Sequence, residues 1–289
     1  MAGKSERQRR IAREKHRRQQ ELRAVRRRQR RKRGVIALSV ILGAALIASL
    51  LAVFLPSGSS KHPSASASKS PSATPSATTV AEPARHCTFT KSGTAARAVS
   101  LPSATPDYTA SYQATITTNL GKIAVNLENS KATCTVNSFI HLAEAGYFNN
   151  TQCHRLLTSG IYVLQCGDPY ATAATKLTCS STSKIGTGIP GYEFASENLT
   201  DAKYPAGTVA MANEGSATTN GSQFFIVYKD STSGLGATYT PFGTVSSGLG
   251  IVQNVAKDGY SCQYTVSGQS EGGAPKEKVI IDSVTIKKT

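Results

Sequence analysis

The folded part of this chain lacks the sequence features that mark a metalloenzyme, a nucleotide-binding enzyme or a covalent catalyst. No C-x-x-C or H-x-x-x-H spacing occurs, so a zinc site is not expected. The glycine-rich GTGIPG at residues 186–191 has neither the Lys-Ser/Thr of a phosphate loop nor a helix after it, and it indicates turns only. The five histidines cannot be combined with a serine or cysteine into a nucleophilic set. We therefore expect no cofactor, no metal and no covalent intermediate.

Net charge is also missing from the C-terminal part, although the chain as a whole carries a formal charge of +16. Residues 1–33 hold sixteen Lys and Arg against three Glu, whereas residues 108–289 hold twelve residues of each sign. Most of the excess positive charge therefore lies in the N-terminal tail, and no basic face for nucleic acid is expected on the folded part. Nucleic-acid or ribosome binding by the tail stays open, but a topology signal that touches anionic lipid is favoured.

Charge is absent again from residues 34–55, which are 22 mostly apolar residues. As a helix they would span about 33 Å, enough to cross a bilayer core of roughly 30 Å. The basic cluster before them predicts a cytoplasmic N-terminus and an extracytoplasmic C-terminal part. The alternative is a cleaved signal peptide, but the apolar run is long, the preceding region has 33 residues and no convincing cleavage site follows. We predict an uncleaved, single-pass anchor in the cell membrane.

Residues 56–107 are rich in Ser, Ala, Pro and Thr and have no periodic apolar face. Such a segment cannot bury enough apolar surface to order itself, so it predicts a flexible, disordered spacer. For residues 87–106 a second interpretation stays open, in which this stretch lies along the surface of the following domain.

All six cysteines lie after the predicted span, at positions 87, 134, 153, 166, 179 and 262. This distribution fits an oxidising exterior and up to three disulfides, and it leaves fifteen possible pairings open. A bridge between Cys153 and Cys166 would close a predicted hairpin. Alternation along the strands puts these two cysteines on opposite faces, so that bridge would need a β-bulge.

From Tyr108 onward the sequence has the alternation and periodicity of a globular domain. Hairpins are predicted at residues 112–127 and 153–167, further strands at 207–212, 223–228, 242–245 and 278–287, helices at 133–145 and 248–257, and loops at 169–191 and 213–221. Thr133 or Thr135 is expected to cap the first helix, and Gly146 to end it. Many strands, two helices and a long-range closing strand favour an antiparallel barrel capped by helices.

The stretch CHRLLTSGIYVLQCGDP, residues 153–169, places a lone arginine on an apolar strand. Such an arginine either pairs with a carboxylate or serves a site. His154, its neighbour, is expected to be a buried core histidine. The remaining candidates form a set without a nucleophile, namely Arg155, Gln165, Gln223, Met211, Phe225 and Tyr162. Taken from the residues alone, Met211, Phe225 and Tyr162 would be core filler.

Two motifs resemble those of the cyclophilin family of peptidyl-prolyl isomerases, over roughly residues 110–288. HRLLTSGIYVLQCGD resembles the family's F-H-R-V-I-P-G-F-x-x-Q-G-G-D, and GTVAMANEGSATTNGSQFFIVY resembles G-x-x-x-M-A-N-x-G-x-N-T-N-G-S-Q-F-F-I. GYEFASEN and PFGTV add support. The resemblance implies a mainly β fold, an eight-stranded antiparallel barrel capped by two helices, and rotamase activity on X–Pro bonds.

Matched by position, Arg155 is the implied catalytic arginine and Gln165 the glutamine that orients it. The implied substrate-binding residues are Tyr162, Met211, Ala212, Asn213, Gln223, Phe225, Leu235 and Tyr239. Within this set, the backbone of the M-A-N segment would hold the substrate peptide, and Gln223 and Phe225 would line the proline pocket.

Several departures from the family pattern bear on these assignments. The Arg-to-Gln spacing is two residues longer than usual, and the loop between M-A-N and S-Q-F-F is one residue longer. Tyr162 stands where a phenylalanine is usual, and Tyr239 where a histidine is usual. The chain has no tryptophan, and in the family a tryptophan confers strong cyclosporin binding, so weak drug sensitivity is expected.

The sequence thus predicts a basic cytoplasmic tail (1–33), a transmembrane helix (34–55), a disordered spacer (56–107) and a cyclophilin-like isomerase domain (108–289). The expected partners are proline-containing segments of exported proteins whose folding it assists, and the membrane through residues 34–55. Nucleic acid is not expected, and the chain is expected to be a monomer. The alternative function is a non-catalytic module that binds proline-containing loops of cell-envelope partners. A structural wall-spanning protein fits the spacer but not the motifs.

Overall fold

The computed structural model describes residues 86–180, 183–266 and 269–289. The predicted tail, the predicted membrane span and residues 56–85 of the predicted spacer lie outside these ranges. Within them, no helix has the length and apolar composition needed to cross a bilayer.

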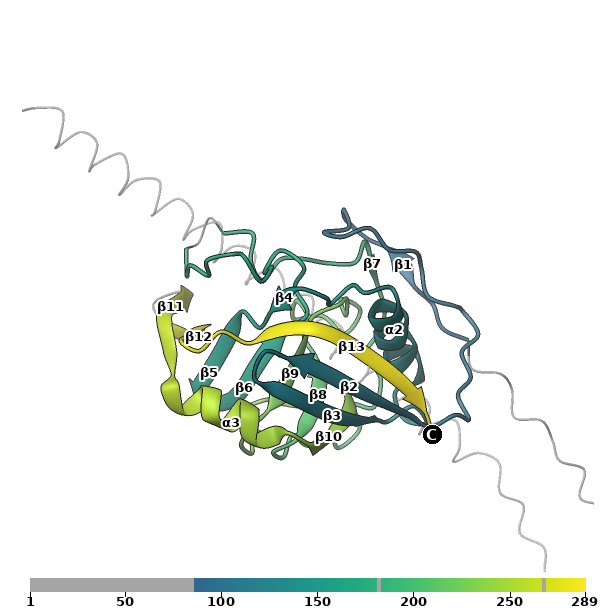
Figure 1. The fold of residues 1–289 in the computed structure, drawn as a ribbon. Coiled ribbons are helices and arrows are strands. Elements are labelled where there is room, and N and C mark those ends of the chain that lie inside the picture. The colour runs from purple at the N-terminus through teal and green to yellow at the C-terminus, as the bar shows by residue number, and fades with distance from the viewer. Residues whose placement is uncertain (1–85, 181–182, 267–268) are drawn as a thin grey trace, which may run out of the picture. The chain divides into compact units, whose positions relative to one another are not determined.

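Eleven antiparallel strands form the main sheet, in the order β11-β12-β5-β6-β9-β8-β10-β3-β2-β13-β4 (Figure 1). The strands are β2 (Tyr112–Thr118), β3 (Gly121–Leu127), β4 (Thr151–Gln152), β5 (Arg155–Ser159), β6 (Ile161–Cys166), β8 (Thr208–Met211), β9 (Phe224–Val227), β10 (Pro241–Ser247), β11 (Tyr260–Val266), β12 (Gln269–Pro275) and β13 (Ile280–Lys288). The mainly β fold is confirmed. The resemblance implied eight strands, whereas the described residues pair eleven, with β11 and β4 at the two ends of the order; closure into a barrel stays a prediction.

The predicted hairpin at residues 112–127 is confirmed as β2 and β3. The strands pair from Tyr112 opposite Leu127 to Thr118 opposite Gly121, and Gly121 takes a φ of 128° that closes the turn. Alternate residues of both strands are buried, as the apolar alternation predicted. β13 pairs with β2 along nearly its whole length, so the last strand in the sequence lies next to one of the first strands of the domain.

Two helices accompany the sheet, α2 (Thr133–Glu144) and α3 (Leu249–Asp258), each close to its predicted bounds. The predicted cap of α2 was wrong, because its N-cap is Ala132 and no side chain of the helix itself caps it. The Glu197 carboxylate instead accepts hydrogen bonds from the backbone N–H groups of Cys134 at 3.1 Å and Thr135 at 2.8 Å. A distant loop therefore supplies the negative charge that a helix N-terminus favours, and local sequence could not reveal it.

Residues 86–107 pack against the domain. Cys87 forms a disulfide with Cys134 on α2, and β1 (Thr90–Lys91) pairs with β7 (Tyr192–Glu193) in a separate two-stranded sheet. The Arg97 guanidinium donates to the carbonyl oxygens of Gly146, Tyr147 and Asn149, which follow the end of α2. Of the two interpretations left open for this stretch, the structure therefore shows the surface-packed one, and the disordered spacer does not extend over residues 86–107.

All six cysteines are paired, as Cys87–Cys134, Cys153–Cys166 and Cys179–Cys262. Arg155 is paired with Gln165, and the backbone N–H of His154 also donates to the Gln165 carbonyl, so two residues of one strand lie opposite one of the other. This is the β-bulge that a Cys153–Cys166 bridge required. The described residues of the loop predicted at 169–191 form no named strand, whereas the hairpin of β11 and β12 was not predicted.

Candidate active site

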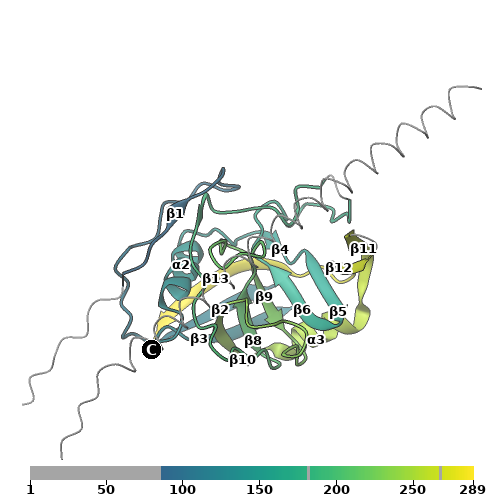
Figure 2. The same ribbon diagram turned by 180° about the vertical axis from the view of Figure 1, so that it is seen from behind.

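Three neighbouring strands place the central site residues in one row. Arg155 on β5 is the register partner of Gln165 on β6, and Gln165 is the partner of Phe225 on β9. Directly paired residues on adjacent strands project from the same face of a sheet. Figure 2 shows β5, β6 and β9 side by side from the face opposite to that of Figure 1. Residues distant in sequence, from both motifs, are thus neighbours.

A pocket opens beside this row. It is lined by Arg155, Leu157, Ile161, Val163, Gln165, Ala212, Asn213, Phe225, Leu235 and Tyr239. Seven of the ten predicted site residues are among them. Leu157, Val163, Phe225 and Leu235 belong to one buried apolar cluster, and these four side chains give the pocket a hydrocarbon wall. The only charged group in the lining is the guanidinium of Arg155.

Tyr239 is held in place from two sides. Its ring packs edge-to-face on Phe225 with centroids 5.5 Å apart. The Tyr204 hydroxyl donates to the Tyr239 carbonyl at 2.8 Å and accepts from the Tyr239 N–H at 3.2 Å. The loop before Tyr239 thus brings both Leu235 and Tyr239 to the pocket.

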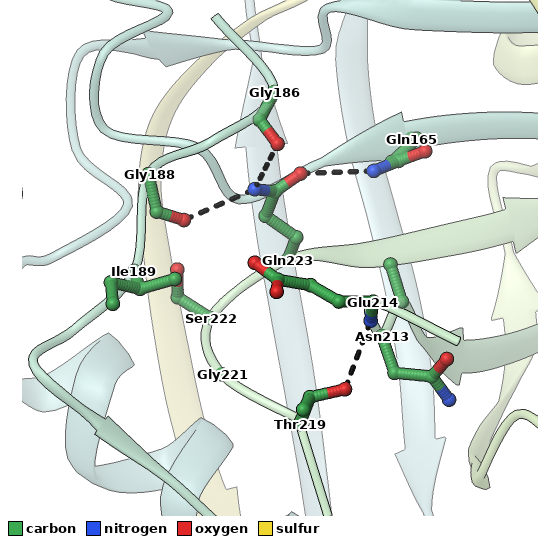
Figure 3. A pocket seen from close by; sticks show the side chains of 11 residues that line it. Gln165, Gly186, Gly188, Ile189, Asn213, Glu214, Thr219, Gly221, Ser222 and Gln223 are labelled. Carbon is green, nitrogen blue, oxygen red and sulfur yellow. Dashed lines mark hydrogen bonds between the residues drawn. The ribbon is translucent and has the colours of Figure 1, made fainter. Parts of the chain in front are cut away.

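A chain of amides links the pocket to the loop that follows β6. The Gln165 amide donates to the Gln223 side-chain oxygen at 2.9 Å, and the Gln223 amide donates to the carbonyls of Gly186 and Gly188, both at 3.0 Å (Figure 3). With its oxygen held toward Gln165, Gln223 fixes the orientation of that side chain beside Arg155. Gln223 lines the neighbouring pocket and is absent from the lining of the apolar one.

A second, polar pocket adjoins the first and shares Gln165, Ala212 and Asn213 with it. Its lining otherwise consists of Gly186, Gly188, Ile189, Glu214, Thr219, Gly221, Ser222 and Gln223. Glu214 is the one charged side chain of this lining, and in Figure 3 it extends across the pocket. The Asn213 amide donates to the Thr238 carbonyl at 2.9 Å, which ties the rim between the two pockets to the loop before Tyr239.

Two predicted site residues lie elsewhere. Met211 is 2% exposed and packs in the main core, on the other face of the strand from its neighbour Ala212. Tyr162 lies on the face of β6 opposite to Ile161 and Val163. Its ring packs against Tyr228 at 6.0 Å and lies under the Lys229 ammonium at 4.5 Å. Neither side chain lines the apolar pocket.

The sequence-based assignment missed Leu157, Ile161 and Val163. Strand alternation could have found them, because Ile161 and Val163 share the face of Gln165, and Leu157 shares the face of Arg155. The assignment of Tyr162 came from matching a family phenylalanine across a turn that is two residues longer here.

Two buried ionisable groups flank the hairpin of β5 and β6, which carries Arg155 and Gln165. His154 is 2% exposed, as expected for a core histidine, and neither ring nitrogen has a hydrogen-bond partner among the described residues. Burial and the nearby Arg155 charge lower the pKa of His154 to about 3, so the ring is neutral at physiological pH. The Asp168 carboxylate accepts hydrogen bonds from the N–H groups of Tyr170 and Gly186, while burial raises its pKa. Asp168 therefore ties the end of the β5–β6 hairpin to the loop that Gln223 contacts.

Fold and site together define a mainly β domain that can hold an apolar group beside an arginine, without a nucleophile among the pocket residues. The model of the family described as cyclophilin type peptidyl-prolyl cis-trans isomerase/CLD matches residues 113–286. This is more than half of the chain, and the chain belongs to the cyclophilin-type peptidyl-prolyl cis-trans isomerase family.

Individual relatives agree. A probable peptidyl-prolyl cis-trans isomerase B of Mycobacterium leprae is 42% identical over 195 residues, which are 63% of this chain and 59% of that protein. The peptidyl-prolyl cis-trans isomerase-like 1 of Emericella nidulans is 38% identical over 142 residues, 49% of this chain and 79% of that protein. A crystal structure of a cyclophilin type isomerase from Cryptosporidium parvum aligns with a TM-score of 0.50 at 25% identity, covering 62% of this chain and 99% of that one. This chain spans less than two thirds of the length of the mycobacterial relative.

Proposed function

We propose that this chain catalyses the cis–trans isomerisation of X–Pro bonds, with Arg155 as the catalytic residue. The observation that carries the proposal is the row of Arg155, Gln165 and Phe225 beside an apolar pocket. Family membership adds support.

The chemistry asks for no nucleophile. An X–Pro bond rotates over a barrier of about 18–20 kcal/mol because resonance gives it double-bond character. As the bond twists, the prolyl nitrogen leaves resonance and its lone pair becomes a hydrogen-bond acceptor. The Arg155 guanidinium can donate to that nitrogen only in the twisted state, and an interaction confined to the transition state is what lowers a barrier.

The other groups hold the substrate. The hydrocarbon wall of Phe225, Leu235, Leu157 and Val163 would bury the proline ring and exclude water. Gln165, itself held by Gln223, would keep the guanidinium aimed, and the backbone at Asn213 would hold the substrate chain on the rim between the pockets.

The test is a proline-isomerisation assay on the purified full chain, with a peptide substrate and with a refolding protein. Arg155→Ala should keep the fold, by circular dichroism and thermal unfolding, and lose most of the activity. Arg155→Lys keeps the charge but not the rigid fork, and should recover only a small part. Full activity of folded Arg155→Ala would overturn the mechanism.

The same assay separates the alternative function. A non-catalytic module that binds proline-containing loops would show affinity for such peptides but no acceleration by the wild-type chain. The side-by-side placement of Arg155 and Gln165 favours the enzyme, because binding a proline ring alone needs only the apolar wall.

We also propose that residues 34–55 anchor the chain in the cell membrane with the isomerase domain outside the cytoplasm, where it assists folding of exported proteins. The uncharged length of that segment and the position of every cysteine after it support this. The test is protease treatment of intact cells, which should digest the domain and leave the N-terminal tail protected. Protection of the domain until lysis, or a cleaved chain released from the cells, would contradict the proposal. A single chain supplies the whole pocket, so we expect a monomer by light scattering.

A further inference from the structure

The Cys153–Cys166 disulfide borders the pair of Arg155 and Gln165. The two cysteines lie opposite each other with Cα atoms 4.0 Å apart, and Cys166 directly follows Gln165 on β6. Both are buried, at 3% and 1% exposure. Only the bulged residue His154 separates Cys153 from Arg155.

The chain changes its hydrogen-bonding partner at this point. Thr151 and Gln152 pair with β13, and the Cys153 N–H donates to the Val279 carbonyl at 2.9 Å. One residue later the His154 N–H donates to the Gln165 carbonyl at 3.0 Å, and regular pairing with β6 begins at Arg155. A bulge interrupts the ladder and re-aims the strand, so the direction in which the chain enters β5 is set immediately before Arg155.

The Cys166 end of the bond is fixed independently. Gly167, the next residue, has a φ of 86°, and a Cβ added to it would lie 2.4 Å from the Ser222 carbonyl oxygen. The Ser222 hydroxyl donates to the Gly167 carbonyl at 2.9 Å. Because the Gly167 and Ser222 backbones pack this closely, the chain next to Cys166 cannot shift without displacing its neighbour. The disulfide ties Cys153 to this closely packed segment.

We propose that the Cys153–Cys166 disulfide is a positioning element for catalysis, which holds the bulge and thereby aims Arg155 at the pocket beside Gln165. This rests on the proposed isomerase function. Misplacing a catalytic group by about 1 Å can cost on the order of 100-fold in rate. The disulfide therefore acts on the rate, beyond the constraint that any cross-link places on the unfolded chain.

The chain contains its own control. Cys87–Cys134 closes a loop of 47 residues, against 13 for Cys153–Cys166. It joins the segment of residues 86–107 to α2, which contributes no residue to the lining of the apolar pocket. Chain entropy alone predicts that losing the longer loop costs at least as much stability. A purely structural role would therefore make the Cys87–Cys134 variant the worse of the two.

The experiment compares Cys153→Ala/Cys166→Ala with Cys87→Ala/Cys134→Ala in the full chain, well below both unfolding temperatures. For the first variant we expect kcat to fall about tenfold or more with KM within about twofold, because the apolar wall still binds the proline ring. For the control we expect a lower unfolding temperature and a kcat within about twofold of wild type.

Wild-type kcat in the folded Cys153→Ala/Cys166→Ala variant, or equal losses in both variants, would overturn the proposal. If the alanine pair does not fold, Cys153→Val/Cys166→Ala fills more of the vacated volume and replaces it. Failure of that variant to fold as well would also overturn it, since the bond would then be needed for the fold and not for aim. An inactive wild-type chain would instead overturn the isomerase function itself, so the two failures are distinguishable.

Discussion

Two adjoining pockets share one rim but differ in chemistry. One has a hydrocarbon wall and the Arg155 guanidinium, whereas the other is lined by glycines, hydroxyls and amides and has Glu214 as its charged group. The first is built largely on strands, and its cross-strand pairs leave little freedom. The second is built on loops. Under the proposed mechanism the apolar pocket would carry the reaction, and we propose that the polar pocket influences which chain is accepted.

Of the substitutions considered, Phe225→Ala should have the largest effect on the apolar pocket, because it removes the largest apolar side chain of that pocket. Phe225 is 4% exposed, and truncating a buried phenylalanine costs about 3–5 kcal/mol of stability. KM for a proline peptide should rise severalfold or more in isomerase kinetics, with unfolding followed by denaturant titration. The matched control is Tyr162→Ala on the opposite face of β6, which should leave KM near the wild-type value. Equal effects of both substitutions on KM would mean that the pocket is not where proline binds.

The pH dependence of stability tests the environment of His154, the buried neighbour of Arg155. Its pKa of about 3 in the fold lies below the ordinary value of 6.5, so the unfolded chain binds the proton more readily. The stabilisation from keeping the ring neutral is present above about pH 6.5 and is lost as pH falls toward 3, an effect of up to about 4 kcal/mol. Unfolding free energies measured between pH 7.5 and 4.5 should fall with pH in the wild type and fall less in His154→Phe.

The control for this measurement is His141→Gln on α2, which removes a histidine that is not fully buried. Isomerase activity should not follow this titration while the chain stays folded, because arginine remains charged throughout the range. An activity loss in folded enzyme as the pH falls toward 3, absent in His154→Phe, would assign His154 a role that the proposed mechanism does not contain.

Gln223→Ala tests how the two pockets are connected. Gln223 lines the polar pocket and accepts a hydrogen bond from Gln165, which lines both pockets. Its loss leaves the Gln165 amide without its acceptor and frees the loop carbonyls of Gly186 and Gly188. We expect kcat to fall about tenfold, the equivalent of about 1.4 kcal/mol, with a smaller change in KM. A Gln165→Ala/Gln223→Ala double variant should be no slower than Gln165→Ala alone, because Gln223 acts through Gln165. Additive losses would show that Gln223 contacts the substrate directly.

Features that depend on residues close together in the sequence could be predicted, whereas features that depend on contacts between distant residues could not. Alternation predicted the hairpin of β2 and β3, and helical spacing predicted α2 and α3 to within about two residues. The cap of α2 could not be predicted, because it comes from Glu197, more than 60 residues away. The separation of Tyr162 from the pocket depends on the face of β6, which a one-residue shift in an elongated turn reverses.

The disulfides show the same limit. The compartment and the number of bonds could be argued from position and count, but the Cys153–Cys166 pairing depends on one bulged residue. Two residues carried over by motif, Phe225 and Asn213, both line the pocket, although the loop between them is one residue longer than in the family pattern. At Tyr162 the spacing differs, and there alternation from Gln165 would have been the better guide.

Glu214→Gln is the smallest change we expect to detect, and it tests the polar pocket alone. Glu214 is exposed, so its attraction to a cationic substrate residue is screened and amounts to a fraction of a kcal/mol up to about 1 kcal/mol. The wild type should prefer a proline peptide with a flanking lysine over one with a flanking glutamate by about two- to fivefold in kcat/KM at low salt. The variant should lose that preference without losing activity on a neutral peptide. Glu144→Gln, on an exposed position of α2, is the control and should keep the preference. If the preference survives in Glu214→Gln, or if activity on the neutral peptide drops equally, the polar pocket does not select by charge.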